Sequence, residues 1–244
     1  SSYLALANFY TQVEKYASAV GVYDQLLAIL PDSVSALIGK GSALYMLGDN
    51  EGAETLWLQA KEKAKGRNSG SLGEIHTNLG LLYYYRGDYE LAVVMHELAA
   101  RTLGNDHRVW GRIAESYRAA GNPELERDSY ARAIELAELQ LQLNPNDWET
   151  LGLLGIYHAN VGDAEPALDY MNRMLALDVP LSTPNYFSAL IHWSLGDTEA
   201  AYEELQLAID KGIPASMLLE DPDLMKLRAL DVPRFDAVLY ANQG

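Results

Sequence analysis

A pattern with helical spacing recurs along this chain about every 34 residues. In its clearest copy, residues 73–106, a break at Gly87 separates two stretches whose small and bulky positions lie three or four residues apart. Such offsets bring side chains onto one face of a helix. Each copy is therefore expected to form a helix, a tight turn and a second helix. The defining positions of this copy are His76, Leu79, Gly80 and Tyr83 before the turn, and Ala92, His96 and Ala99 after it.

The same template fits the whole chain in six copies. Their turn positions are separated by 34, 39, 34, 41 and 34 residues, and five of the six are glycine. A near-constant period predicts a solenoid in which each repeat packs on its neighbours. We expect repeats over about 1–33, 34–67, 73–106, 107–147, 148–181 and 182–213, followed by a helical cap over 214–244. The six turn residues are Glu14, Gly48, Gly87, Gly121, Gly162 and Gly196.

These positions resemble the tetratricopeptide repeat. That family has a bulky residue, Leu-Gly or Leu-Ala and an aromatic residue in its first helix, a turn glycine, and a small, bulky, small spacing in its second. The resemblance implies an all-α, right-handed superhelix of six helix pairs with a C-terminal helical cap. The order of motifs from Val109 to Leu239 also resembles the C-terminal repeat modules of bacterial signalling proteins, namely Ser/Thr kinases, adenylate cyclases and winged-helix regulators.

Three local departures from the template carry predictions of their own. The insertion GRNSGS at residues 66–71 predicts a flexible loop, because Gly, Asn and Ser favour turns. The second helix of the fourth repeat, from Pro123 to Leu143, is expected to be about two turns longer than its equivalents. His158 and His192 occupy the position of Tyr83, so we expect them to be packed in the core.

Composition excludes several classes of partner and site. The chain carries 18 Lys and Arg against 34 Asp and Glu, and its net charge of -16 argues against nucleic acid and anionic membranes. Without cysteine it forms no disulfide and no thiolate metal site. No apolar run approaches the roughly 20 residues of a membrane span, so direct membrane insertion is not expected. The chain starts inside a helical pattern without an initiator Met. We therefore expect a piece of a longer protein, cytoplasmic unless an anchor upstream of Ser1 places it in the periplasm.

No enzyme constellation stands out. The five histidines are spread over four repeats, and none pairs with another at the spacing of a helical zinc site. Carboxylates follow several turn glycines because the turn itself recurs, so they do not form a unique acid–base pair. No glycine-rich loop precedes a Lys and a Ser or Thr. We expect no enzyme activity, no metal and no cofactor.

The resemblance implies that the first helices line a concave face that holds a polypeptide. Two features stand out there: Tyr84 and Tyr85 are aromatic anchors of the type found in hot spots, and Arg108 and Arg112 can grip carboxylates. They predict an aromatic or acidic peptide, unless the arginines pair with residues such as Glu115 and the tyrosines only cover helix surface. The expected partner-binding residues are Asn8, Tyr45, Tyr84, Tyr85, Arg108, Arg112, Arg118, Asn160, Tyr186 and Trp193, with Thr11, Gln12, Ser42, Thr77 and Leu81 beside them.

The sequence thus predicts a non-catalytic protein-interaction scaffold within a larger bacterial signalling or regulatory protein. Two alternatives stay open. One is a sensory domain with a small ligand in a closed apolar cavity near Tyr84, Tyr85 and Trp193. The other is self-association to a homo-oligomer through an incomplete first repeat.

Overall fold

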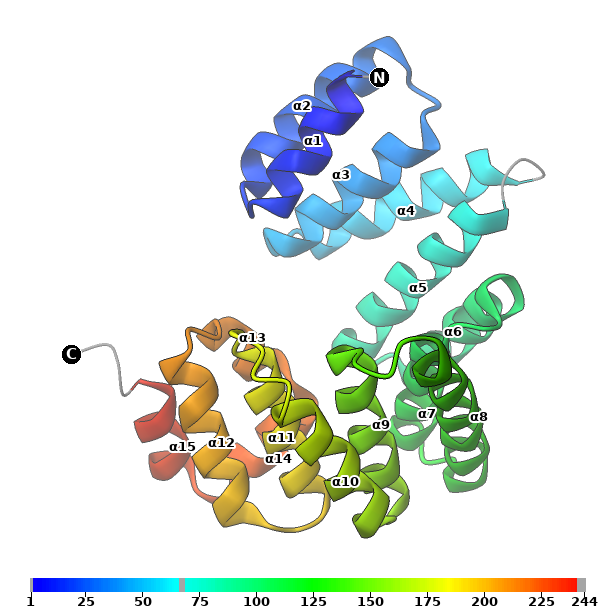
Figure 1. Ribbon diagram of the computed structural model, residues 1–244. Helices are drawn as coiled ribbons and strands as arrows, with labels where there is room; N and C mark the ends of the chain where they lie inside the picture. Colours follow the sequence, from blue (N-terminus) through cyan, green and yellow to red (C-terminus); the bar gives the residue numbers. More distant parts are fainter. Residues whose placement is uncertain (1, 66–68, 241–244) are drawn as a thin grey trace. The chain divides into compact units, whose positions relative to one another are not determined.

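The computed structural model describes residues 2–65 and 69–240, and its regular elements in those ranges are all helices (Figure 1). Twelve of them follow one another as six pairs, and three short helices end the described part. The pairs are α1 (Ser2–Gln12) with α2 (Tyr16–Ile29), α3 (Val34–Met46) with α4 (Asn50–Ala64), α5 (Ser69–Arg86) with α6 (Tyr89–Leu103), α7 (His107–Ala119) with α8 (Pro123–Leu143), α9 (Trp148–Val161) with α10 (Ala164–Leu175), and α11 (Thr183–Ser194) with α12 (Thr198–Asp210). The last three are α13 (Ala215–Glu220), α14 (Pro222–Leu230) and α15 (Val232–Leu239).

Contacts within the chain define two compact units. Unit 1 consists of Ser1–Asn105 and Glu115–Asn122, and unit 2 consists of Asp106–Ala114 and Pro123–Gly244. Helix α7 therefore gives its first half to unit 2 and its second half to unit 1. The two units are described separately below.

All six predicted turn positions have left-handed backbone geometry. The five glycines have φ between 76° and 86°, and Glu14 has a φ of 58°. Glycine adopts this region without steric cost, whereas a side chain is strained there. The helix–turn–helix prediction is confirmed at every copy, including the first, which lacks the glycine.

Helix starts follow polar caps. Ser33 accepts a hydrogen bond from the backbone N–H of Ala36 at the start of α3. Asp221 accepts bonds from two backbone N–H groups at the start of α14, where Pro222 is the first helical residue. Helix α11 begins at Thr183, with Pro184 in its first turn, and the side chain of the preceding Ser182 makes no capping bond.

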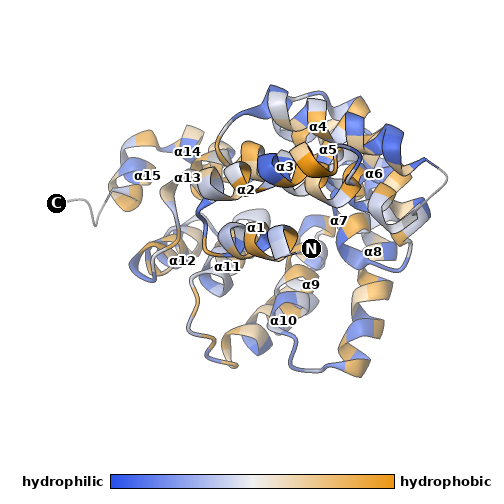
Figure 2. Cartoon of the chain, turned by 90° about the horizontal axis from the view of Figure 1, so that it is seen from above, coloured by the Kyte–Doolittle hydropathy of each residue, from blue (hydrophilic) through white to orange (hydrophobic). Residues whose placement is uncertain are grey.

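The core is built at the contact between helices, where small side chains let them approach closely. In Figure 2 hydrophobic and hydrophilic residues alternate around most ribbons, as expected of amphipathic helices with one buried face. At the small position that follows the turn, alanine is completely buried in five of the six pairs. A larger side chain there would push the second helix away from the first. These residues are Ala19, Ala53, Ala92, Ala167 and Ala201.

Two of the local predictions have clear outcomes. Helix α8 has 21 residues, whereas the other second helices have 12 to 15, so the longer helix is confirmed. The loop predicted at 66–71 is wrong for its last three residues, because α5 begins at Ser69. Residues 66–68 lie outside the described part.

The last three helices cover the end of the sixth pair. Leu218, Leu224, Phe235 and Leu239 are buried against α12, in one cluster with Leu205. Arg234 ties α15 to α12, since its guanidinium forms two hydrogen bonds with the carboxylate of Glu199.

Candidate functional site

In the first five repeats, the bulky position of the second helix, nine residues after the turn, does more than fill the core. In unit 1 the hydroxyl of Tyr23 donates to Oδ1 of Asn8 at 2.7 Å, and the indole N–H of Trp57 donates to the carbonyl of Ile38 at 3.2 Å. His96 occupies the same position, and its Nδ1 lies 2.9 Å from the hydroxyl of Ser116. These side chains therefore carry polar tips that meet polar groups of first helices.

Unit 2 repeats the arrangement with different partners. Nδ2 of Asn160 donates to the hydroxyl of Tyr130 at 2.9 Å, and the hydroxyl of Ser188 lies 3.1 Å from the sulfur of Met171. Sequence reasoning placed these bulky residues in the core but missed their partners. The available signal was that most of them are Tyr, Trp or His, whose polar atoms need a partner when buried.

In several repeats, a glycine of a first helix leaves room for the polar end of the bulky side chain from a second helix. A Cβ atom at Gly39 would collide with the hydroxyl of Tyr23, and one at Gly41 would collide with the indole of Trp57. The hydroxyl of Tyr23 thus passes beside α3 and reaches Asn8 on α1. Asn8 is exposed, so the bond to Tyr23 fixes the orientation of its amide while its N–H₂ group can still donate.

Helices α1, α3 and α5 together present what we call the first-helix face of unit 1. Helix α3 contacts both α1 and α5, so residues on these three helices share a surface. The hydroxyls of Thr11, Ser42 and Thr77 each donate to a carbonyl one turn earlier in their own helix. Every residue that the sequence assigns to this face is uncharged, in a chain of net charge -16. These residues are Asn8, Thr11, Gln12, Ser42, Tyr45, Thr77, Leu81, Tyr84 and Tyr85.

Aromatic side chains lie on two helices of this face. The ring of Tyr45 is 5.9 Å from that of Trp57. Tyr84 is half-buried and its ring lies 5.6 Å from Tyr85 and 5.7 Å from Tyr89, both in edge-on geometry. Tyr85 is 47% exposed. These edge-on neighbours restrict the ring of Tyr84, and a restricted aromatic side chain loses little entropy on binding.

Of the two arginines predicted to bind a carboxylate of a partner, Arg108 already binds a carboxylate of its own chain. Nε and Nη2 of Arg108 each lie 3.0 Å from an oxygen of Asp106, so this guanidinium is already engaged in two bonds. For Arg108, the alternative that the arginines pair with acidic residues of this chain is thus realised, with Asp106 as its partner. Arg112 and Arg118 are half-buried on α7.

The remaining predicted residues belong to unit 2. Asn160 is engaged at both ends, since its Oδ1 also accepts from the hydroxyl of Ser194 at 3.0 Å. Tyr186 is buried, and its hydroxyl donates to the carboxylate of Asp221. Trp193 is half-buried and packs against the cluster that α11 and α12 form with the last three helices. Tyr186 and Trp193 thus contribute to the packing of the cap.

The described ranges show no cluster of metal-ligating side chains. No set of three or more His, Asp or Glu side chains there could hold a metal ion. His158 is buried, as predicted, with its ring stacked on Tyr170 and its Nδ1 3.5 Å from the carboxylate of Asp163. The helices that could be searched are also too short or too polar to cross a bilayer.

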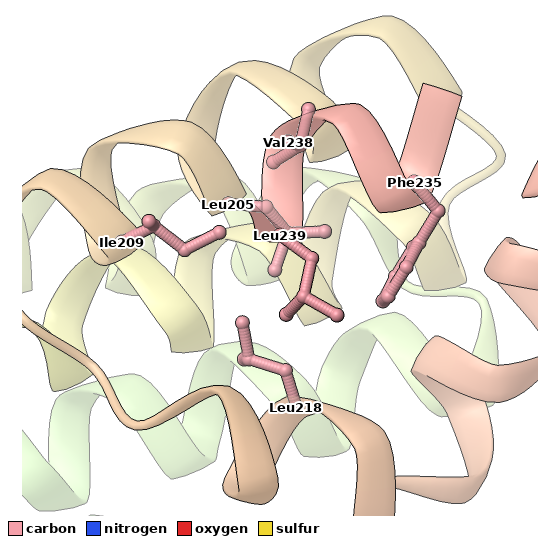
Figure 3. A pocket seen from close by; sticks show the side chains of 6 residues that line it. All are labelled: Leu205, Ile209, Leu218, Phe235, Val238 and Leu239. Atoms are coloured by element: carbon pink, nitrogen blue, oxygen red, sulfur yellow. The ribbon is translucent and has the colours of Figure 1, made fainter. Parts of the chain in front are cut away.

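A small apolar hollow lies in the cap (Figure 3). It has essentially no room for a group the size of a water molecule, whereas ligand pockets begin at roughly 300 Å³. Its lining offers no polar group that could orient a ligand. The residues that line it are Leu205, Ile209, Leu218, Phe235, Val238 and Leu239. Tyr84, Tyr85 and Trp193, near which the small-ligand alternative expects a cavity, are not among the residues that line this hollow.

Comparison with known sequences points to one family. The model of the family described as tetratricopeptide repeat matches residues 4–67. The peroxisomal targeting signal receptor of Saccharomyces cerevisiae is 29% identical over 104 residues, which is 43% of this chain and 16% of that protein. Superkiller protein 3 of Schizosaccharomyces pombe is 24% identical over 102 residues, 42% of this chain and 7% of that protein. The chain thus spans only a small part of these relatives.

Comparison with solved structures concerns the fold. A chain of the APC/C hetero-tetramer Cut9–Hcn1 superposes with a TM-score of 0.65 at 18% identity, covering 94% of this chain and 42% of that one. A tetratricopeptide repeat protein from Parabacteroides merdae gives 0.62 at 17% identity, over 93% and 83% of the two chains. PilF of Pseudomonas aeruginosa gives 0.57 at 18%, over 94% and 96%. Residues 4–67 match the tetratricopeptide-repeat family, and the chain as a whole has the all-α solenoid fold of such repeat proteins.

Proposed function

We propose that this chain is a non-catalytic scaffold that binds a polypeptide on the first-helix face of unit 1. The tetratricopeptide fold is typical of protein–protein interaction scaffolds and is generally non-catalytic. One relative of part of the chain is a receptor for a targeting signal. The observation that carries the proposal is Asn8, an exposed amide held in place by a buried tyrosine.

The geometry of Asn8 suits a peptide backbone. Tyr23 occupies the amide oxygen, so the N–H₂ group is the part left to donate to a carbonyl of an extended chain. A fixed donor loses less freedom on binding than a mobile one. Tyr85 supplies exposed aromatic area on the same face, of the kind that carries binding energy at hot spots.

The charges of the two regions favour an uncharged segment over an acidic one. The first-helix face of unit 1 has no arginine or lysine among its assigned residues. Arg108, which was the candidate for an acidic partner, is paired with Asp106 and would have to give up two hydrogen bonds to bind another carboxylate. We therefore propose a partner segment with apolar or hydroxyl side chains and few acidic ones.

The kind of protein that contains this scaffold is proposed from the sequence. The order of motifs between Val109 and Leu239 resembles repeat modules of bacterial signalling proteins, which supports a place within a larger signalling or regulatory protein. On this proposal the chain recruits another protein to that larger assembly.

Peptide selection tests the binding face. The chain is used to select peptides from a random display library, and their affinities are measured by calorimetry against the wild type and single variants. We expect selected peptides to be poor in Asp and Glu. Tyr85→Ala should weaken them about tenfold or more, as for a hot-spot residue, and Asn8→Ala should weaken them by a smaller factor.

Tyr240→Ala is the matched control, because Tyr240 is 46% exposed against 47% for Tyr85 and lies at the end of α15 in the cap. It should bind the selected peptides like the wild type. Equal affinity of all three variants would show that the peptides bind elsewhere. Selection of predominantly acidic peptides would instead move the site to the arginines of α7.

A further inference from the structure

Helix α5 carries a charged residue, Glu74, that is not among the residues assigned to the first-helix face of unit 1. Thr77, Leu81 and Tyr84 follow it after three, seven and ten residues, and these offsets place all four side chains on one side of α5. The side chain of Glu74 is exposed. On α5, the first-helix face therefore includes a carboxylate near the start of the helix.

The carboxylate of Glu74 also lies near the bond between Tyr23 and Asn8. Burial raises the pKa of Tyr23, the hydroxyl of Thr11 opposes this in part, and the negative charge of Glu74 raises the pKa further. Salt solution screens exposed charges over about 10 Å, so an effect of this kind requires that the two groups lie close together. Because Tyr23 donates to Asn8, the charge on α5 and the fixed amide on α1 flank the same tyrosine hydroxyl.

Among the Lys, Arg, Asp and Glu residues of α1, α3 and α5, Glu74 alone has no partner of opposite charge in the described part of the chain. Helix α1 has no such residue. On α3, Lys40 is paired with Asp24 at 2.6 Å, and on α5, Arg86 is paired with Glu54 at 2.8 Å. No Lys or Arg lowers the pKa of Glu74, and loss of water raises it.

A cation supplied by a partner would compensate the Glu74 carboxylate. Neighbouring protein atoms keep water from part of it, which disfavours the charged form and raises its pKa. A positive group beside it favours the charged form again. A metal ion would need several ligands, and no group of three or more His, Asp or Glu side chains in the described ranges could hold one. A lysine or arginine needs only one carboxylate, and the net charge of -16 attracts basic segments.

We propose that the polypeptide bound on the first-helix face of unit 1 places a lysine or arginine side chain on Glu74. This inference rests on the proposed function, because it assigns one residue of the same partner. Glu74 and Tyr84 are separated by about 15 Å along α5, which four or five residues of an extended chain cover. The basic residue is therefore expected a few positions from the residue that contacts Tyr84 and Tyr85.

Paired selections test whether Glu74 recognises the cation. Peptides are selected from one random display library with the wild type, with Glu74→Lys and with Glu90→Lys. Glu90 is also an exposed glutamate of unit 1 but lies on α6, so its variant changes the net charge equally outside the three helices of the face. The wild type and Glu90→Lys should enrich Lys or Arg at one position, whereas Glu74→Lys should not. Equal loss of this enrichment in both variants, or no enrichment with the wild type, would overturn the proposal.

Calorimetry on one selected peptide then measures the contact itself. The basic residue of the peptide is replaced with methionine, which keeps an unbranched side chain and removes the charge. This replacement should weaken binding to the wild type and to Glu90→Gln about fivefold, and it should leave binding to Glu74→Gln unchanged. An equal loss with all three proteins would mean that the cation binds elsewhere and would contradict the inference.

The same measurements separate this inference from the proposed function. If Tyr85→Ala weakens the selected peptides while their basic residue shows no coupling to Glu74, the binding face stands and the inference fails. If neither Tyr85→Ala nor Glu74→Gln changes binding, the peptides bind outside the face, and the proposed function and the inference fail together.

Discussion

Single residues at the turns determine where each repeat folds back. Five of these positions are glycine, and the sixth, Glu14, adopts the same left-handed backbone with a φ of 58°. Its backbone N–H bonds to the carbonyl of Thr11, as the turn requires, so the turn is made at the expense of strain on a residue with a Cβ atom. The first repeat is therefore locally strained where the others are relaxed.

Replacing Glu14 with glycine should stabilise the chain. Relief of the left-handed strain is expected to outweigh the added freedom of the unfolded chain, giving a gain of about 0.5–1 kcal/mol in the free energy of unfolding. Urea denaturation measures it. Glu14→Ala is the control, because it removes the same charge and keeps the Cβ atom. A gain of equal size in both variants would attribute the effect to charge.

At the scale of one element, the start of α7 is held by a polar cluster whose members His107, Thr150 and Tyr157 are buried. Nδ1 of His107 lies 3.2 Å from the hydroxyl of Tyr157, and its Nε2 lies 3.5 Å from the hydroxyl of Thr150. Thr150 in turn donates to Asp147, which also accepts from the amide of Gln140. Helices α7, α8 and α9 are joined through these bonds. Burial lowers the pKa of His107, opposed in part by the nearby carboxylates of Asp106 and Asp147.

This lowered pKa predicts loss of stability in mild acid. Between the ordinary histidine pKa of about 6.5 and the lower folded value, the unfolded chain binds more protons than the folded one. Stability that is complete above pH 6.5 should therefore fall as the pH drops below it. Burial also lowers the pKa of His76, which adds to the same trend.

Urea midpoints measured from pH 8 to pH 5 test this prediction. The variant His107→Gln should be less stable than the wild type at pH 8, and its midpoint should fall less as the pH drops. His76→Gln serves as a comparison in unit 1, since it should remove a separate part of the fall. An unchanged pH dependence in His107→Gln would mean that the pKa of His107 is the same in the folded and the unfolded chain, and would contradict the prediction.

Also at this scale, the sequence predicts elements better than it predicts partners. The turn positions, the long α8 and the cap at Asp221 follow from local rules about glycine, spacing and proline, so they could be read from the chain. The bonds from Tyr23 to Asn8 and from Tyr130 to Asn160 could not, because the repeat pattern specifies the size of a side chain at each position and not its hydrogen-bond partner. The pairing of Arg108 with Asp106 was missed for the same reason: its partner lies two residues away along the chain, whereas the helical pattern drew attention to residues one turn away.

At the scale of the whole molecule, acidic residues outnumber basic ones by 34 to 18. Most ion pairs in the described part of the chain are exposed, as for Lys65 with Glu62 and Arg173 with Asp169, and exposed pairs contribute little to stability. The repeat pattern gave no sign of two compact units, because every repeat carries the same signals whichever unit it joins. A net charge of -16 acts on both units and opposes compactness through self-repulsion.

Salt should therefore stabilise this chain. Screening reduces the self-repulsion more than it weakens exposed pairs, so the thermal midpoint at pH 7 should rise by a few degrees between low and moderate sodium chloride, equivalent to about 1 kcal/mol. The measurement is made at protein concentrations where sedimentation shows a monomer, so that dimer formation does not contribute. Potassium chloride at equal ionic strength should act alike, and a midpoint that falls with salt would show that ion pairs outweigh repulsion.

The hydrogen bonds that the bulky side chains of the second helices make with first helices have a consequence for how such a chain can evolve. Repeats of one family are often regarded as interchangeable modules, yet here the hydroxyl of Tyr23 needs an amide, the indole of Trp57 needs a carbonyl and His96 needs a hydroxyl. Exchanging two repeats would preserve every turn and every alanine contact while separating these matched groups. These buried contacts therefore depend on the order of the repeats. Duplication or exchange of a single repeat would leave buried polar atoms without a hydrogen-bond partner.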